Sequence, residues 1–375
     1  MSEENTITKA DAVPSPRDGA AKEALLEVTN LTKHFPIYAG FPIKHKVGAV
    51  QAVDGIDLTI HTGESFGLVG ESGCGKSTTG RLITRLLEPT DGRISYRGRD
   101  ITRASRKEMM PVRSEIQMIF QDPYSSLNPR QTVGTIIGGP MEINHIDPPG
   151  GREQRVRELL ETVGLNPEHY NRFPHEFSGG QRQRIGVARA LALEPKLIVA
   201  DEPVSALDVS IQAQVVNLLQ KVQAELGIAF LFIAHDLAIV RHFTQRVAVM
   251  YLGKIVEIGD RDSIYNRPRH PYTHALLSAV PEVDIDGADR ERIRLAGDVP
   301  SPINPPSGCR FRTRCWKARE LCAAQEPPLI QIGGNRDGHL TACHFPEEPT
   351  IAARAQDIVL DPALAAIEEA AENTL

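Results

Sequence analysis

The sequence of 375 residues has no apolar run long enough to cross a bilayer, which takes roughly 20 residues. Its strongest apolar stretch, residues 228–234, has the length of a buried strand. Residues 1–22 mix Ser, Glu, Lys, Pro and Asp and contain no apolar core of a secretory signal. If this protein acts at a membrane, we therefore expect other chains to cross it.

Basic charge and aromatic residues are also scarce. Lys and Arg together number 42 against 48 Asp and Glu, the formal net charge is −6, and aromatic residues make up 5% of the chain. Nucleic-acid binding needs a basic face, so we expect no nucleic-acid partner. Without an export signal the expected compartment is the cytosol, where disulfides are disfavoured. The five cysteines therefore need another explanation.

The hydrophobic pattern predicts an α/β fold. Leu26, Val28 and Leu31 begin strand-like segments, and apolar residues alternate over 56–60 as in a strand with one buried face. A compact apolar run at 66–69, a glycine-rich loop and a helical pattern predict a strand–loop–helix unit over 65–88, its helix including Leu82, Ile83, Leu86 and Leu87.

Two further apolar runs, 197–200 and 229–234, are too short for helices and are typical of central strands in a parallel sheet. The long stretch before them contains helical patterns at 152–163 and 181–193. That length exceeds a simple crossover and predicts an inserted helical subdomain at about 122–180. No internal repeat is visible, so we expect one such domain, flanked by a disordered tail (1–24) and a second tail (347–375).

The glycine-rich loop fits the P-loop pattern in the strand–loop–helix context that the pattern requires. Its residues are Gly70, Glu71, Ser72, Gly73, Cys74, Gly75, Lys76 and Ser77, followed by Thr78. Backbone N–H groups of such a loop converge on phosphate oxygens, and the helix directs its positive end at them. Lys76 would bind the β- and γ-phosphates of a nucleotide, and the Ser77 hydroxyl would ligate Mg²⁺. The helix N-terminus could also make Cys74 a reactive thiol.

A pair of carboxylates, Asp201 and Glu202, closes the apolar strand 197–200. The strand would place them at the carboxyl edge of the sheet, where α/β proteins bind ligands. There Asp201 would hold Mg²⁺, and Glu202 would polarise the attacking water as a general base.

A second glycine-containing helix start lies at Phe177, Ser178, Gly179, Gly180 and Gln181. Ser178 with Gln181 three residues later forms a capping box, which by itself explains the local pattern. Two adjacent glycines at a helix N-terminus can also form a second anion site. One P-loop chain has little use for two phosphate sites unless a partner's nucleotide occupies the second.

With this motif the sequence resembles the nucleotide-binding subunits of ABC transporters, whose signature is LSGGQ. The resemblance covers about residues 25–345 and identifies 25–265 as the ATPase domain, a P-loop NTPase with a RecA-like, mainly parallel core and an antiparallel β part. It implies that Phe35 stacks on adenine, that Gln121 is the Q-loop glutamine, that Asp208 ends the D-loop, and that His235 contacts the γ-phosphate.

The resemblance further implies a head-to-tail dimer. One ATP would be held by Lys76, Ser77, Gln121, Asp201, Glu202 and His235, with Gln121 also near Mg²⁺, while Ser178 and Gly180 close over the ATP of the other subunit. Glu202, His235 and Gln121 would be the catalytic residues.

Residues 266–346 resemble the C-terminal extension of dipeptide and oligopeptide importer ATPases, through the segments 268–279 and 299–311. Residues 77–81 are closer to the second of the two ATPase subunits that pair in these importers. This implies a heterodimer with a homologous ATPase, two permease subunits, an external peptide-binding protein as an indirect partner, and a peripheral position on the cytoplasmic face of the inner membrane. Nickel or glutathione importers of the same family, and soluble ABC ATPases, are the alternatives.

The extension is expected to be small and irregular, and it contains Cys309, Cys315, Cys322 and Cys343. Their spacing fits neither the common zinc pairs nor the common ferredoxin patterns. The family resemblance implies a 4Fe–4S cluster on this quartet; zinc and ordinary thiols are the alternatives. Nearby basic residues, Arg310, Arg312, Arg314 and Lys317, are expected to offset the charge of thiolates.

Overall fold

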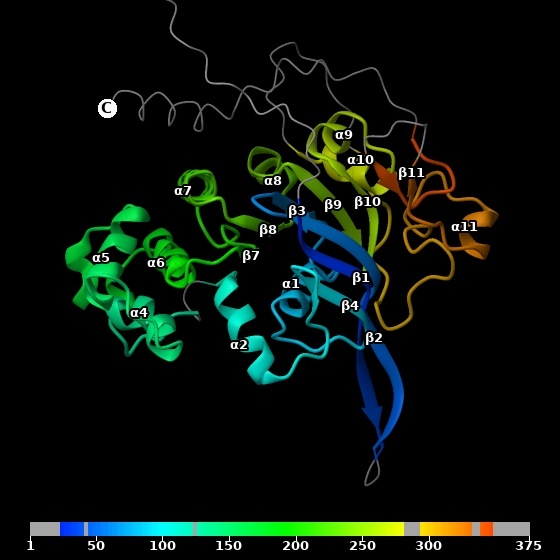
Figure 1. Cartoon of the computed structure of the whole chain (residues 1–375). Coiled ribbons are helices and arrows are strands. Elements are labelled where there is room, and N and C mark those ends of the chain that lie inside the picture. Colours follow the sequence, from blue (N-terminus) through cyan, green and yellow to red (C-terminus); the bar gives the residue numbers. More distant parts are fainter. Residues whose placement is uncertain (1–22, 41–43, 123–125, 281–292, 332–337, 348–375) are drawn as a thin grey trace, which may run out of the picture.

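The computed structural model describes residues 23–40, 44–122, 126–280, 293–331 and 338–347 (Figure 1). The tails predicted at 1–24 and 347–375 lie almost wholly outside these residues, and the first strand already begins at Ala24. Within the described ranges, no helix is long and apolar enough to cross a membrane.

A mixed sheet forms the centre of the molecule. Its strand order within the described residues is β11, β12, β10, β9, β3, β8, β7, β6. The parallel strands are β9 (Arg246–Tyr251), β3 (Ser65–Val69), β8 (Ala229–Ala234), β7 (Leu197–Asp201) and β6 (Ile116–Ile119). β10 (Lys254–Asp260) runs antiparallel to β9. The mainly parallel core predicted from the apolar runs is confirmed.

The sheet is buried on both faces, which explains why its strands are apolar throughout rather than alternating. In β8, Phe230 and Phe232 point into one hydrophobic core, whereas Leu231 and Ile233 point into the other. All four side chains are fully buried.

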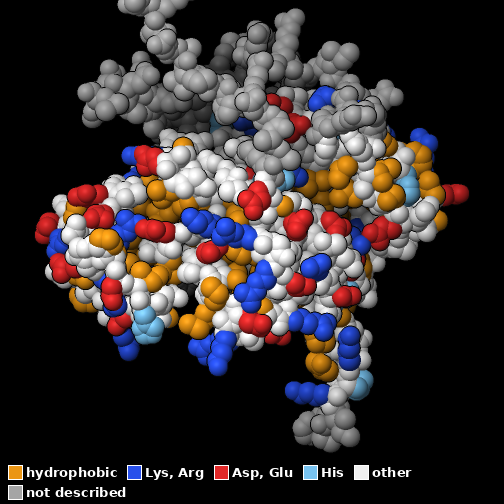
Figure 2. Space-filling model, viewed as in Figure 1, with side chains coloured by type: hydrophobic (Ala, Val, Ile, Leu, Met, Phe, Trp, Pro, Cys, Tyr) orange, Lys and Arg blue, Asp and Glu red, His pale blue; other side chains and the backbone are white. Residues whose placement is uncertain are grey.

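The antiparallel part is a second sheet in the order β2, β1, β4, β5. Its strands are β2 (His45–His61), β1 (Ala24–Ala39), β4 (Asp91–Tyr96) and β5 (Arg99–Asp100). The long hairpin of β1 and β2 projects from the body (Figure 1), and basic side chains lie along it (Figure 2). Its sequence includes Lys33 and Lys46.

Helices cover the main sheet and form a lateral group. Near the sheet lie α1 (Lys76–Ile83), α2 (Arg106–Glu115), α7 (Val209–Leu226) and α8 (Leu237–Phe243). The lateral group contains α4 (Val133–Ile143), α5 (Arg152–Thr162), the 3-10 turns η1 (Pro167–Asn171) and η2 (Pro174–Glu176), and α6 (Gly179–Leu191). It stands away from the antiparallel sheet (Figure 1). The helical subdomain at about 122–180 stays a prediction in its bounds, and α6 of this group continues beyond them to Leu191.

Helix α1 is shorter than predicted. It ends at Ile83, the following Arg85 adopts a left-handed φ of 54°, and Leu86 is 55% exposed. The amides of Leu86 and Leu87 both bond the Arg81 carbonyl, which closes the helix before the apolar pattern ends.

The C-terminal extension completes the main sheet instead of forming a separate lobe. It contains α10 (Pro271–Ser278), α11 (Glu320–Ala324), β11 (Ile330–Gln331) and β12 (Leu340–Thr341), and α9 (Arg261–Asn266) leads into it. β12 pairs with β10, where the buried Glu257 accepts hydrogen bonds from the Arg269 and His270 amides and contacts His339 Nε2 at 2.7 Å.

Candidate functional site

The P-loop lies between β3 and α1 and packs closely on two neighbouring backbones. Gly70 has φ 152°, and a Cβ there would lie 2.1 Å from the Met250 carbonyl oxygen. Gly75 has φ 112°, and its Cβ would lie 2.1 Å from the Ala52 carbonyl oxygen. These positions require glycine because a side chain would push the loop away from the sheet.

Lys76 sits inside this loop. Its Nζ donates to the carbonyl oxygens of Gly70 at 2.7 Å and Glu71 at 2.9 Å, and the residue is 3% exposed. The loop therefore curls around the ammonium group, in the place where a P-loop lysine meets phosphates.

Ser77 and Asp201 meet beside the loop. Asp201 ends β7, and its Oδ1 accepts a 2.7 Å hydrogen bond from Ser77 Oγ. Burial raises the pKa of Asp201, and the bond from Ser77 acts in the opposite direction. A hydroxyl oxygen and a carboxylate oxygen side by side are ligands that suit Mg²⁺. This ion binds proteins through one or two such groups and the substrate phosphates.

Two of the three predicted catalytic side chains, Gln121 and His235, meet one carboxylate oxygen of the third, Glu202. Glu202 Oε2 accepts from Gln121 Nε2 at 3.0 Å and lies 3.3 Å from His235 Nδ1. The Glu202 side chain is 12% exposed and that of His235 54%. Glu202 has a left-handed φ of 46°, and its amide bonds the Ile233 carbonyl of β8, so β8 fixes the turn that aims this carboxylate.

The signature segment begins α6 with the predicted capping box. Gln181 N donates to Ser178 Oγ at 3.3 Å, and Ser178 N donates to Gln181 Oε1 at 3.0 Å. A Cβ at Gly180 would lie 2.4 Å from Ile211 Cγ2, so this glycine allows α6 to pack on α7. Gly179 is partly exposed and Ser178 exposed, while Asp208 takes the N-cap position of α7.

Phe35 lies on β1 opposite Val50 of β2, two residues before Ala52, whose carbonyl faces Gly75. The Phe35 ring is partly buried, and the Lys33 ammonium lies over it, 5.0 Å from the ring centroid. This places Phe35 on the strand pair that borders the P-loop; its contact with adenine stays a prediction.

Cys74 is not the reactive thiol that the helix N-terminus suggested. It is 3% exposed, and burial raises the pKa of its thiol although Lys76 acts in the opposite direction. Desolvation of the thiolate outweighs the nearby positive charge, so this expectation is wrong.

The four late cysteines line one pocket, together with His270 and Phe311; they are Cys309, Cys315, Cys322 and Cys343. Burial raises the pKa of Cys309 to about 11 and that of Cys343 to about 12. Nevertheless, no group of three or more His, Cys, Asp or Glu within the described ranges is spaced to hold a metal ion. The structure thus gathers the thiols without showing a metal site, and the cluster stays a prediction.

Two of the basic residues among the cysteines, Arg310 and Arg314, have other partners than thiolates, which corrects the sequence-based expectation for them. Burial raises the pKa of Cys315, and the Lys317 charge acts in the opposite direction, as expected. Arg310 and Arg314 form ion pairs with Asp54 and Glu71, far earlier in the chain. Lys317 pairs with Glu347, and Arg312 bonds Ser307. Sequence reasoning missed the contact with the P-loop, because nothing local to residue 314 indicates a partner 243 positions away.

A P-loop on a mainly parallel sheet, a carboxylate pair at its edge and a capped glycine pair on a helical insertion define an ATP-binding cassette ATPase. The family model described as "ABC transporter" matches residues 53–205, and the one described as "Oligopeptide/dipeptide transporter, C-terminal region" matches residues 256–322.

Known relatives agree with these matches. The chain is 55% identical to the putative oligopeptide transport ATP-binding protein YkfD of Bacillus subtilis, over 86% of this chain and 95% of that protein. It is 54% identical to the oligopeptide transport ATP-binding protein OppF of Salmonella typhimurium, over 82% of this chain and 93% of that protein. A dimeric structure of the ATP-binding cassette MJ0796 in a post-hydrolysis state, bound to ADP and Pi, matches 63% of this chain and 98% of that chain, with 28% identity and a TM-score of 0.56.

The chain belongs to the oligopeptide/dipeptide family of ABC transporter ATP-binding proteins, and within it to the OppF-like second ATPase subunits. Its activity is ATP hydrolysis coupled to peptide transport.

Proposed function

We propose that this subunit powers the import of dipeptides or oligopeptides as one half of a head-to-tail heterodimer with a homologous ATPase. The pair would act on two permease subunits from the cytoplasmic face of the inner membrane, and an external binding protein would deliver the cargo. The observation that carries this proposal is that one chain joins an ABC ATPase domain, in which Ser77 meets Asp201 and Gln121 meets Glu202, to the oligopeptide/dipeptide C-terminal region.

In this proposal the residues of the P-loop bind the nucleotide. Lys76 would exchange the carbonyls of residues 70 and 71 for β- and γ-phosphate oxygens, which are better acceptors for an ammonium group. Ser77 and Asp201, with Gln121, would hold Mg²⁺, which neutralises charge on the phosphates. Phe35 would stack on the adenine.

Hydrolysis would use the triad of side chains around Glu202. This carboxylate would accept the proton of the attacking water, Gln121 would orient the carboxylate, and His235 would contact the γ-phosphate. Because Ser178 is exposed at the start of α6, it can close over the nucleotide of the partner subunit. Closure would then depend on ATP in both sites.

The test is reconstitution of the subunit with its partner ATPase and permeases in vesicles. ATP-dependent accumulation of a labelled tripeptide supports the proposal. Accumulation of Ni²⁺ or glutathione instead would favour another cargo of the same family. ATP hydrolysis that responds to nucleic acid, with no copurifying membrane subunit, would contradict a transport role.

We further propose a 4Fe–4S cluster on the quartet Cys309, Cys315, Cys322 and Cys343, with zinc the less favoured occupant. Its support is that all four side chains line one pocket. The sulfur atoms would have to draw closer, and binding of a metal would deprotonate thiols whose pKa burial holds high. Protein purified without oxygen should be brown and contain iron and sulfide, and Cys322→Ser should lose both. Colourless protein with zinc supports zinc, and metal-free protein refutes both.

A further inference from the structure

The C-terminal extension reaches directly into the P-loop. Arg314 donates two hydrogen bonds to the Glu71 carboxylate, from Nη1 at 2.6 Å and from Nη2 at 3.1 Å. The Arg314 side chain is 8% exposed and that of Glu71 27%. Such bidentate contacts fix the orientation of both groups in addition to pairing their charges. The guanidinium carbon also lies over the Tyr251 ring, 6.0 Å from its centroid.

A second group of the extension holds the same P-loop residue. The Glu71 amide donates to Tyr272 Oη at 2.8 Å, and Tyr272 of α10 is fully buried. The Glu71 carbonyl in turn accepts from Lys76. The side chain and the backbone amide of this one residue are therefore held by the extension, and its carbonyl by the phosphate-binding lysine.

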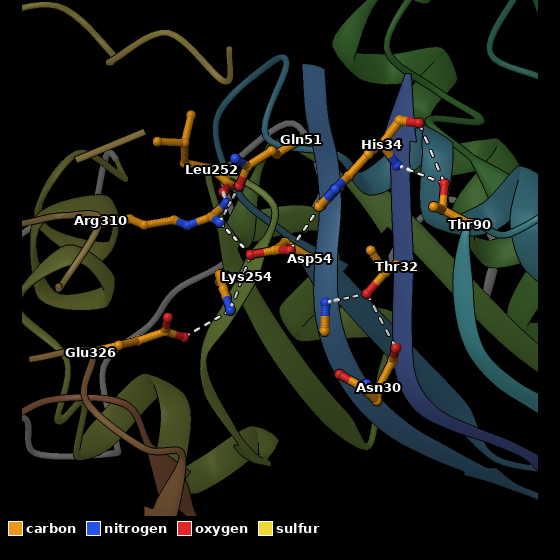
Figure 3. Close-up of polar contacts among 11 residues, drawn as sticks. Asn30, Thr32, His34, Gln51, Asp54, Thr90, Leu252, Lys254, Arg310 and Glu326 are labelled. Atoms are coloured by element: carbon orange, nitrogen blue, oxygen red, sulfur yellow. Dashed lines mark hydrogen bonds and ion pairs between the residues drawn. The ribbon is translucent and has the colours of Figure 1, made fainter. Parts of the chain in front are cut away.

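A third contact joins the extension to β2 and to the turn after β9 (Figure 3). Arg310 donates to the Leu252 carbonyl, to Gln51 and to Asp54. The next residue after Leu252, Gly253, donates its amide to the Cys74 carbonyl at 2.8 Å. The P-loop is thus flanked at residues 71 and 74 by groups that the extension orders.

We propose that Arg314 is a positioning residue of the nucleotide site, which neutralises the Glu71 carboxylate and fixes the P-loop in the form that accepts a triphosphate. This rests on the proposed nucleotide site. Glu71 is the second residue of a loop that receives a strongly anionic ligand. Without Arg314 its carboxylate would be unpaired and would repel that ligand, and the adjacent amides would lose their fixed direction.

The experiment measures MgATP binding and steady-state hydrolysis on the full chain with its partner ATPase. Arg314→Gln should raise the Kd and KM for MgATP by about tenfold, with kcat changed less than about threefold. Arg312→Gln is the matched control, because Arg312 belongs to the same segment and its guanidinium bonds Ser307, away from the P-loop. Arg314→Lys, which keeps the charge but not the bidentate contact, should lie between the two.

The double variant separates charge compensation from a merely structural role. Glu71→Gln in the Arg314→Gln background removes the unpaired carboxylate and should restore the KM to within about threefold of the parent value. An unchanged KM in Arg314→Gln, or no restoration in the double variant, would overturn the proposal. If Arg314→Gln does not fold, Arg314→Lys decides, because it keeps the charge but not the bidentate contact: a KM for MgATP equal to that of the parent would overturn the proposal.

Lys76→Ala distinguishes this inference from the nucleotide site on which it rests. If Lys76→Ala binds MgATP normally, the P-loop assignment itself is wrong. If Lys76→Ala loses binding while Arg314→Gln behaves like Arg312→Gln, only the role of Arg314 fails.

Discussion

Replacing Arg310 by methionine tests how firmly the extension is attached to the rest of the molecule. Its side chain is 9% exposed and donates to Leu252, Gln51 and Asp54 (Figure 3). Methionine keeps most of the apolar stem but no donor, so three acceptors lose a charged partner.

The expected cost follows from these contacts. A hydrogen bond to a charged group contributes about 1.5–3 kcal/mol, and a buried pair that loses one partner costs about 3–5 kcal/mol. Asp54 is 23% exposed and keeps Lys254 at 3.2 Å and His34 at 2.8 Å, which reduces the penalty. We therefore expect Arg310→Met to destabilise the extension by about 2–4 kcal/mol.

The sequence supplies a local probe for this measurement. Trp316 is the single tryptophan of the chain and lies in the extension. Its fluorescence during urea unfolding reports the extension, whereas far-UV circular dichroism reports the whole fold. Arg312→Met is the control and should change the free energy of unfolding by less than about 0.5 kcal/mol. An equally small change in Arg310→Met would refute the reasoning.

Four further outcomes follow from the site and the core. Glu202→Gln should bind ATP but lower kcat by about 10²- to 10⁴-fold; parent-level turnover would exclude it as the base. Ser77→Ala should raise the Mg²⁺ concentration for half-maximal binding about tenfold or more, measured by titration, because Asp201 loses its partner. Cys74, buried and with a raised pKa, should be alkylated much more slowly in the folded chain than in urea. Burial lowers the pKa of His270 to about 4, so the folded state binds fewer protons than the unfolded state below pH ~6.5. Stability should then fall as the pH drops from about 6.5 to about 4, and His270→Asn should flatten that slope in thermal unfolding.

The elements that carry the ATPase site could be predicted because their signals are local. The apolar runs that became β3, β7 and β8 are short and continuous, since both faces of a parallel sheet are buried. The P-loop glycines and the Ser178–Gln181 capping box are also encoded within a few residues. The closeness of Asp201 to Ser77 could be predicted as well, because the strands that precede these residues end at the same edge of the sheet.

Contacts between distant segments could not be predicted in the same way. Arg314 and Arg310 were expected to offset the charge of cysteine thiolates, yet they pair with Glu71 and Asp54. The burial of Cys74 likewise could not be predicted from the helix start, because distant residues pack against the loop: the Met250 carbonyl lies against Gly70 and the Ala52 carbonyl against Gly75. Charge and size are visible in a sequence, but the partner that a side chain meets is not.

The sequence by itself thus predicted the local elements of this ATPase: a glycine-rich loop that fits the P-loop pattern, a carboxylate pair at a strand end and a capped glycine pair at a helix start. These depend on spacing within single strands, turns and helix starts, where the backbone alone sets the geometry. Only the tertiary structure decided how the extension meets the P-loop. Pairing of β12 with β10 and docking of Arg310 bring Arg314 to Glu71, and contacts across such separations arise from the packing of the whole chain.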